Sequence, residues 1–479
     1  MSNLLDVISA LQVQDAPFRP YFNTGTMFDY GTGDFVPGKD GSTVLNGGFA
    51  GTNSVAGRAQ LYKSSLSSGI EVNALARYPN SQLVIKDSEW ALRKKRVIRA
   101  SNLFLDNPEL RQKHLEELEA RIVINTPDQF TGIEDWFEKV VIPIVEYKLK
   151  HRKDFTVESP ILDPKTLKPL LMLIPTFVAI DSWTEAKSSP AETMLDKHGS
   201  ADPESNMFWM RDGNVKSKLL HQMTHLAAKA NIIFVLTAHI GDNKTLDGGR
   251  APPTKELQYM KQADKIKGAG SGWHFLISNA LQCMSATVLQ DEHKECEYPY
   301  PNDMTGPTEM SEINTVILRN KNNAAGTSFP FVSSQTNSLD IPLTNFNYLR
   351  RNDYFGLGTN KAQTRPYFTP DTTISRKSAT ARILDYKVSR GIEILAQLKF
   401  VQNCWSLRQQ PVPYDITPEA LAEFFVSKPT YALDDILNSR GWWTYGTHER
   451  NYLSLFDILA IVAGLYKPKF LSLYNPAKK

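Results

Sequence analysis

Two short apolar runs that each end in a polar residue constrain the fold most. Residues 176–181 read TFVAID and end in Asp181, and residues 232–239 read IIFVLTAH and end in His239. Both are far shorter than the roughly 20 residues of a membrane span, and each is typical of a buried strand. Between them, residues 215–230 repeat apolar side chains at helical spacing. Apolar strands that alternate with helices predict an α/β fold with a mostly parallel, twisted sheet flanked by helices.

The composition excludes several classes of protein. The chain has 479 residues, with 54 basic and 51 acidic side chains and a net charge of +3. It is long enough for two or three domains, or for one large core with an appendage. Because its charge is nearly balanced, the chain lacks the large positive charge of proteins that cover nucleic acid non-specifically. Any anion-binding site must therefore be a local basic patch.

The cysteines and the first residues bear on the cellular compartment. Cys283, Cys296 and Cys404 are odd in number and widely spaced, which argues against a disulfide scaffold or a zinc module. The first residues do not resemble a signal peptide, and no apolar run has membrane length. We therefore expect a cytoplasmic protein without a membrane partner.

Residues 57–64 read GRAQLYKS and match the phosphate-binding P-loop pattern G-x-x-x-x-G-K-[ST], with Tyr62 at the second glycine. In such a loop the backbone amides face the phosphates of ATP, Lys63 reaches the β- and γ-phosphates, and Ser64 ligates Mg²⁺. Since a non-glycine residue rarely has a positive φ, we predict a negative φ for Tyr62. An ordinary glycine-rich turn before a helix remains an alternative. The candidate nucleotide-binding residues are Gly57, Arg58, Ala59, Gln60, Leu61, Tyr62, Lys63, Ser64 and Ser65.

Polar side chains end three of the predicted strands. LVIKDSE ends in acids, so Glu89 is a candidate to activate the attacking water. Asp181 is a candidate second contact to Mg²⁺, and His239 is a candidate sensor of the γ-phosphate. Taken singly, these are also explained by solvated turns or structural hydrogen bonds. Ligands bind at the carboxyl ends of parallel strands, so together they predict Mg²⁺-dependent ATP hydrolysis.

These motifs resemble those of the RecA family, most of all the UvsX-type strand-exchange recombinases of large tailed phages. The resemblance covers roughly residues 40–350 and includes GRAQLYKS, Asp87-Ser88-Glu89, VAIDS and LTAHIGD. It implies a RecA-like P-loop ATPase core, in which Glu89 activates water, Asp181 supports the metal and His239 acts as the sensor. The phage branch tolerates an aromatic residue before the lysine. Arg319 and Lys321 resemble a basic segment that reaches the ATP of the neighbouring subunit, where cations stabilise the transferring phosphoryl group.

Two polar segments, near residues 184–214 and 240–272, are predicted to be long loops beside the nucleotide, and in the resembling family they bind DNA. Cations suit the phosphate backbone, and aromatic groups suit base faces. Mixed-charge surface loops without a DNA role are the alternative. The candidate DNA-binding residues are Phe208, Trp209, Arg211, Lys244, Arg250, Lys265, Lys267, Gly268 and Gly270.

The predicted organisation has three parts. Residues 1–40 form a short segment with a small helix and a candidate subunit contact, 41–355 the ATPase core, and 356–479 a mainly helical appendage of unassigned role. In that appendage we expect the aromatic cluster at 442–445 to pack in a core.

The leading hypothesis is an ATP-dependent recombinase that forms a helical filament on single-stranded DNA and takes up duplex during exchange. Single-strand-binding or mediator proteins are candidate partners, and the site of action is the cytoplasm, that of the host if a phage encodes the chain. The alternatives are a hexameric, ring-forming replicative helicase with the same core, and a non-catalytic structural protein.

Overall fold

The computed structural model describes residues 18–101, 108–189, 191, 205–242, 255–270, 272–301, 305–354, 362–427, 431–445 and 451–471. The predicted helix near the N-terminus lies outside these ranges. None of the helices within them combines the length and apolar character that a bilayer crossing needs.

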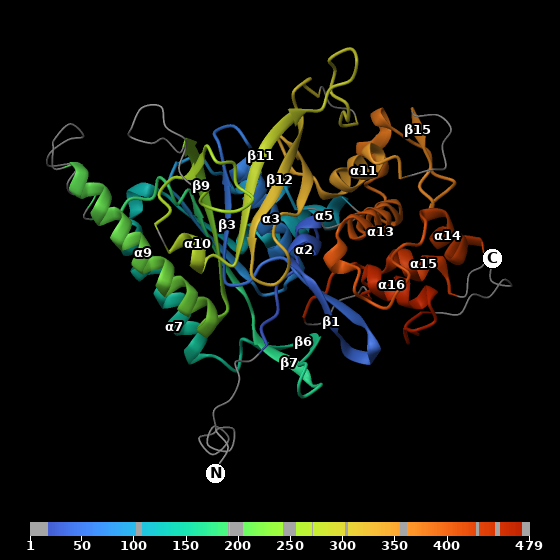
Figure 1. The fold of residues 1–479 in the computed structure, drawn as a ribbon, viewed down its shortest axis with the longest axis horizontal. Helices are drawn as coiled ribbons and strands as arrows, with labels where there is room; N and C mark the ends of the chain where they lie inside the picture. The colour runs from blue at the N-terminus through green and yellow to red at the C-terminus, as the bar shows by residue number, and fades with distance from the viewer. Residues whose placement is uncertain are drawn as a thin grey trace, which may run out of the picture.

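A ten-stranded sheet forms the centre of the molecule, in the order β14-β13-β12-β11-β3-β9-β8-β4-β5, with β10 paired to β9 (Figure 1). The strands from β11 to β5 run parallel, whereas β12, β13 and β14 extend the sheet in antiparallel fashion. This confirms the α/β fold with a mostly parallel sheet. The parallel strands are β3 (Thr52–Gly57), β4 (Gln82–Asp87), β5 (Ile122–Asn125), β8 (Thr176–Asp181), β9 (Ile232–Asp242) and β11 (Asn279–Val288). The others are β10 (Asp264–Ile266), β12 (Met310–Asn320), β13 (Ser328–Ser334) and β14 (Ser338–Leu339).

Helices cover both faces because the central strands are apolar on both sides. In β8, Phe177 and Ala179 belong to one buried cluster, and Val178 and Ile180 belong to another. The first cluster includes α3 (Lys63–Arg77) and α2 (Met27–Thr32). The second includes α6 (Ile133–Trp136), α7 (Ile142–Lys150), α9 (Ser205–Ala230) and α10 (Trp273–Leu276). This period of two is what a strand buried on both faces requires.

Two hairpins and two helices complete this part of the chain. β1 (Asp34–Pro37) pairs with β2 (Thr43–Asn46) outside the main sheet. The sequence STVLNGG at 42–48 predicts a strand directly before the P-loop, but β3 takes that place in the main sheet. The second hairpin joins β6 (Thr156–Leu162) and β7 (Pro169–Leu173). α4 (Lys94–Arg99) and α5 (Pro108–Ala120) lie between β4 and β5 in the chain.

The segment after the sheet is mainly helical, and it lies at the right of Figure 1. Trp443 is fully buried and packs against Phe22 and Tyr78. This confirms the predicted packing role of the aromatic cluster, whereas the domain boundaries at 40 and 355 stay predictions. The larger helices are α11 (Ile341–Arg351), α13 (Tyr386–Asn403), α15 (Leu433–Asn438) and α16 (Leu455–Val462), and the shorter ones are α12 (Ala379–Arg382) and α14 (Pro418–Ala422).

Both predicted DNA loops are shorter than expected. α9 begins at Ser205, so residues 205–214 are helical. The expected boundary was wrong because the polar residues 211–214 (RDGN) interrupt the apolar pattern that begins at residue 215, although the helix continues through them. In the second segment, β9 continues to Asp242 and pairs with β10, so an antiparallel stem replaces both ends of the predicted loop.

Candidate functional site

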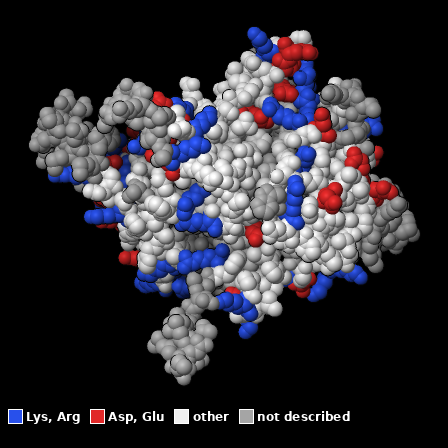
Figure 2. Space-filling model, in the orientation of Figure 1, with Lys and Arg blue, Asp and Glu red and all other residues white. Residues whose placement is uncertain are grey.

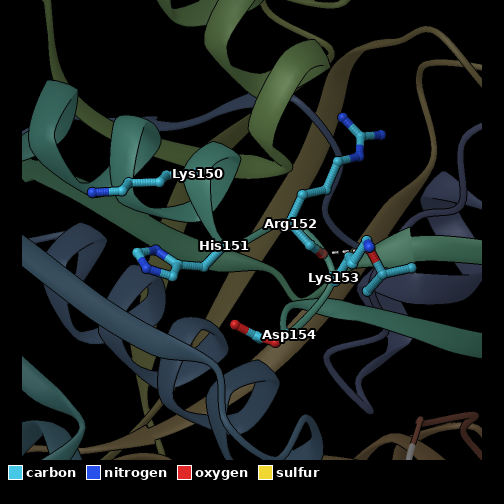
Figure 3. Close-up of a pocket in the computed structure, with 6 residues that line it drawn as sticks. Lys150, His151, Arg152, Lys153 and Asp154 are labelled. Atoms are coloured by element: carbon cyan, nitrogen blue, oxygen red, sulfur yellow. Dashed lines mark hydrogen bonds between the residues drawn. The ribbon is translucent and has the colours of Figure 1, made fainter.

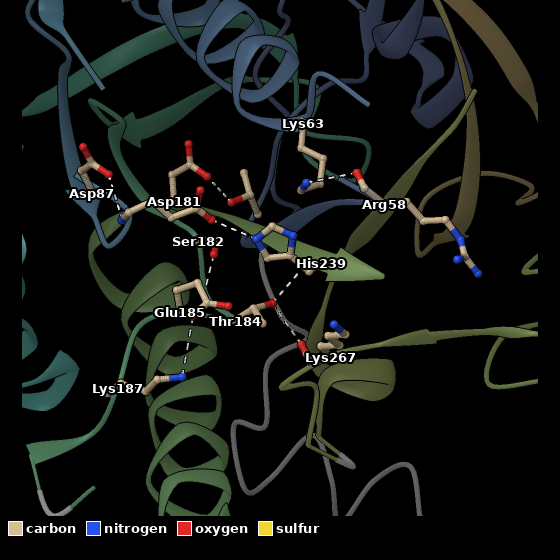
Figure 4. Close-up of polar contacts among 12 residues, drawn as sticks. Arg58, Lys63, Asp87, Asp181, Ser182, Thr184, Glu185, Lys187, His239 and Lys267 are labelled. Atoms are coloured by element: carbon tan, nitrogen blue, oxygen red, sulfur yellow. Dashed lines mark hydrogen bonds and ion pairs between the residues drawn. The ribbon is translucent and has the colours of Figure 1, made fainter. Parts of the chain in front are cut away.

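The sheet register brings the predicted catalytic strand ends together. Gly57 pairs with His239 across β3 and β9, and Asp87 pairs with Asp181 across β4 and β8. Because β8 also pairs with β9, all four positions lie at one edge of the sheet (Figure 4). This is the edge formed by the carboxyl ends of the parallel strands, where ligands bind in α/β folds.

The P-loop backbone differs from our prediction at Tyr62. Tyr62 precedes α3 with φ 56° and ψ 27°, in the left-handed region, and Gln60 also has a positive φ of 64°. The expected negative φ was therefore wrong. Between Gly57 and Lys63 the chain turns from a strand into a helix, and the tyrosine ring is held against the main core cluster. Its hydroxyl also accepts a hydrogen bond of 3.2 Å from Ser311. These contacts offset a left-handed conformation that costs about 1–2 kcal/mol.

Lys63 lies over the glycine that begins the loop. A Cβ atom on Gly57 would lie 3.0 Å from Lys63 Cγ and 3.2 Å from Cys283 Cβ, so a larger residue would crowd the lysine. Lys63 Nζ donates to the backbone oxygen of Arg58 at 3.3 Å. Burial lowers the pKa of Lys63, and the negative charges of Glu89 and Asp181 oppose this effect. The ammonium group has no direct carboxylate contact among the described residues and fits an incoming phosphate.

Ser64 and Asp181 form the predicted metal site. Asp181 is buried and accepts hydrogen bonds from the hydroxyls of Thr237 and Ser64. Burial raises the pKa of Asp181, and the two hydroxyls oppose that rise. Within the described ranges, no three His, Cys, Asp or Glu side chains form a metal cluster. One hydroxyl and one carboxylate fit a Mg²⁺ ion that takes its other ligands from phosphates and water.

Glu89 and His239 contact each other at the same edge. His239 Nε2 lies 2.9 Å from Glu89 Oε1. Burial acts to raise the pKa of Glu89, but hydrogen bonds from His239 and Ser182 and the charge of Lys63 hold this pKa below its usual value. The carboxylate is therefore ionised at neutral pH and oriented by two donors. Asp87 instead shapes the turn, because its carboxylate accepts from the amides of Glu89 and Leu92.

His239 is also tied to the end of the second predicted DNA loop. Its carbonyl accepts from the amide of Lys267 at 2.8 Å, and its amide donates to Thr184 Oγ1 at 2.9 Å. Thr184 Oγ1 donates in turn to the carbonyl of Lys267 at 3.2 Å, and Trp183 Nε1 donates to that of Gly268 at 3.3 Å. The backbone of His239 is thus hydrogen-bonded directly, and through Thr184, to this segment.

Arg58 makes a second connection, which the sequence analysis missed. Its guanidinium lies 2.9 Å from Asp242 and 2.7 Å from Asp264, the paired residues of β9 and β10. Asp264 is buried and also accepts from Gln282 at 2.9 Å. The P-loop therefore clamps the stem of the second predicted loop. Thr237 was missed as well, although a threonine within an apolar strand is a signal that a search for buried polar groups could use.

Arg319 and Lys321 lie at the opposite edge of the sheet. Arg319 on β12 pairs with Ala280 on β11. Asn279, the residue before Ala280, pairs with Asn53 near the start of β3. β3 rises about 13 Å between Asn53 and Gly57, so neither cation reaches the P-loop of its own chain. Burial, together with the charge of Arg319, lowers the pKa of Lys321, whose Nζ donates to the carbonyl of Leu276. A role at a neighbour's site stays a prediction.

The predicted DNA-binding residues fall into three groups. Lys265, Lys267 and Gly268 are exposed on or beside β10, Gly270 follows them half-buried, and Arg211 is exposed on α9. Phe208 and Trp209 lie on α9, at positions whose side chains are not described. Lys244 and Arg250 lie outside the described residues.

A separate basic pocket lies at the end of α7 (Figure 3). It has a volume of about 770 Å³ and is lined by Lys150, His151, Arg152, Lys153, Asp154 and Thr156. The neighbouring Lys148 donates to the carbonyls of Ile174 and Asn231, just before β8 and β9. The pocket is therefore at the edge opposite the P-loop, and none of the predicted site residues lines it.

Comparisons with known proteins give little beyond this geometry. No protein-family model matches the chain, and neither does any curated protein. Among solved structures, the crystal structure of the RadB recombinase is similar with a TM-score of 0.32 and 14% sequence identity, covering 61% of this chain and 92% of that chain.

Proposed function

We propose that this chain is a Mg²⁺-dependent, DNA-stimulated ATPase that acts as a recombinase on single-stranded DNA. The observation that carries the proposal is the pairing of Glu89 with His239 beside Lys63, with His239 hydrogen-bonded through its backbone to Lys267. A carboxylate suited to orienting water and a lysine suited to phosphate thus share one edge with the base of the predicted DNA loop.

The roles follow from these positions. The amides of the P-loop and Lys63 would bind the phosphates, and Ser64 and Asp181 would hold the metal. When bound, Mg²⁺ neutralises charge on the β- and γ-phosphates. Glu89 orients the attacking water and accepts its proton, and its low pKa keeps it available at neutral pH. His239 holds Glu89 in place and shifts when the γ-phosphate is lost.

Coupling to DNA follows from the links to His239 and Arg58. Both residues contact the segment that carries Lys265 and Lys267. Hydrolysis that moves either contact changes how these lysines are presented to phosphates of DNA. In a filament, we expect Arg319 and Lys321, at the opposite ends of the strands, to face the nucleotide of the next subunit.

The test measures ATP hydrolysis with and without single-stranded DNA, together with electron microscopy in a slowly hydrolysed ATP analogue. We expect stimulated hydrolysis that Lys63→Ala abolishes and Lys153→Ala, in the distant basic pocket, leaves unchanged. Undiminished hydrolysis in Lys63→Ala would refute the site. Rings on DNA would favour the replicative helicase over the filament, and absence of hydrolysis in the wild type would favour the structural protein.

A further inference from the structure

An exposed tryptophan directly follows the proposed catalytic glutamate. Trp90 is 80% exposed and has a φ of 54°. A positive φ is a genuine outlier for a bulky residue, and such strain persists only where the surroundings impose it. Here the amide of Ser88 donates to the carbonyl of Asp181 at 2.6 Å, and Asp87 accepts from the amides of Glu89 and Leu92. The turn thus holds a large apolar ring in solvent.

A run of cations follows the ring. Between Glu89 and Asp106 the chain has no acidic residue, and it has five basic ones, Arg93, Lys94, Lys95, Arg96 and Arg99. All but Lys94 are exposed, and within the described part of the chain none of the five is in an ion pair. α5, which packs against α4, carries glutamates, but they too leave these cations unpaired.

The helix dipole favours Arg96 and Arg99, which lie in the last turn of α4, but it does not explain the three cations at the start. Arg93 precedes the helix and Lys94 and Lys95 begin it, at the end where the helix dipole disfavours positive charge. The position of the helix suggests a functional reason instead. Arg96 donates to Ser65 Oγ at 3.1 Å, so α4 contacts the first turn of α3 beside the P-loop.

We propose that Trp90, Arg93, Lys95, Arg96 and Arg99 form a binding platform for a single-stranded polynucleotide. The indole stacks on a base, and the cations pair with successive phosphates, which is the combination that single strands require. The platform deepens the proposed function, since it adds a nucleic-acid contact outside both predicted loops and next to Glu89. Trp90 directly follows Glu89 in the chain, so a base stacked on the indole would lie beside the proposed catalytic residue.

The experiment measures the binding of labelled oligo(dT) and oligo(rU) by fluorescence anisotropy, without nucleotide and over a range of salt. We expect Trp90→Ala to weaken binding at least about fivefold, and Trp90→Phe to retain most of it. The salt slope is the steepness with which the logarithm of the affinity falls as the logarithm of the salt concentration rises. The triple variant Arg93→Gln, Lys95→Gln, Arg99→Gln should lower this slope by about 2. The relative affinities for the two oligomers identify DNA or RNA as the source of the strand.

The matched control is Lys150→Gln, Arg152→Gln, Lys153→Gln, which removes the same charge from the α7 pocket and should leave the salt slope nearly unchanged. Trp90→Phe should also lose part of the tryptophan quenching that oligo(dT) causes in the wild type, a readout that does not depend on the stability of Trp90→Ala.

Equal slopes in the two triple variants, together with unchanged quenching in Trp90→Phe, would overturn the platform. So would sedimentation showing that Trp90→Ala disrupts self-association while binding is unchanged, because the ring would then be a protein contact. The assay omits ATP, so failure of the proposed ATPase leaves its result intact. Binding that weakens in Trp90→Ala and in the triple α4 variant supports the platform even if hydrolysis is absent.

Discussion

Replacing Tyr62 with glycine tests what holds the P-loop in its left-handed turn. Glycine has no penalty at a φ of 56°, so the substitution removes about 1–2 kcal/mol of backbone strain. It also deletes a half-buried ring that packs on the main cluster, which costs about 0.8–1.5 kcal/mol, half the value for full burial. The hydrogen bond from Ser311 and the added freedom of the unfolded chain each cost about 0.5–1 kcal/mol more. We therefore expect a net loss of about 1 kcal/mol in the free energy of unfolding.

Gln60→Gly is the matched control. Gln60 has a φ of 64°, but its side chain is exposed and makes no hydrogen bond or ion pair with the described residues. Glycine there should relieve strain without losing contacts and stabilise the protein by about 0.5–1 kcal/mol. Urea unfolding followed by tryptophan fluorescence measures both variants. If Tyr62→Gly is stabilising to the same degree as Gln60→Gly, the ring contributes nothing and our account of the turn is wrong.

Three further predictions concern charged groups. Burial lowers the pKa of Lys148 from 10.5 to about 7, so between these values the unfolded state binds more protons. Stability should therefore rise with pH in this window by up to about 1.4 kcal/mol per pH unit, and urea midpoints should show that Lys148→Met removes this contribution. Arg58→Gln leaves Asp264 buried without its cation, so we expect faster amide hydrogen exchange at Asp264–Ile266, and unchanged exchange there would contradict the clamp. Glu89→Gln should lower the hydrolysis rate by about 10²- to 10⁴-fold while a fluorescent ATP analogue still binds; a rate near the wild type's would remove Glu89 from the chemistry.

The sheet and the strand ends could be predicted because their signals are local. In β4, β8 and β9 an apolar run marks the strand, and a polar residue at or just after its end marks the edge, so Glu89, Asp181 and His239 were singled out from the sequence. β3 was not predicted, because its residues TNSVAG form no apolar run. Their convergence followed from one rule, that parallel strands end at a common edge.

The rest depends on contacts between distant segments. The φ of Tyr62 is decided by a ring that packs on residues far along the chain, and a rule about local preference gave the wrong sign. Arg58 meets Asp264 only because β10 folds back on β9. The start of α9 was misplaced because the polar residues 211–214 interrupt the apolar pattern within the helix.

The near balance of charge conceals two opposite arrangements of cations near the carboxyl ends of the parallel strands. At the loop stem Arg58 is neutralised by Asp242 and Asp264, whereas the α4 cations have no carboxylate partner in the described part of the chain. A polyanion gains more where no ion pair must break, so α4 suits a contact that is present with or without ATP. The stem, which Arg58 links to the P-loop, suits a contact that changes with the nucleotide. The salt slope for binding of single-stranded DNA should then differ between the ATP-bound and ATP-free protein, and the second predicted loop should account for the difference. Arg58→Gln should make that difference smaller.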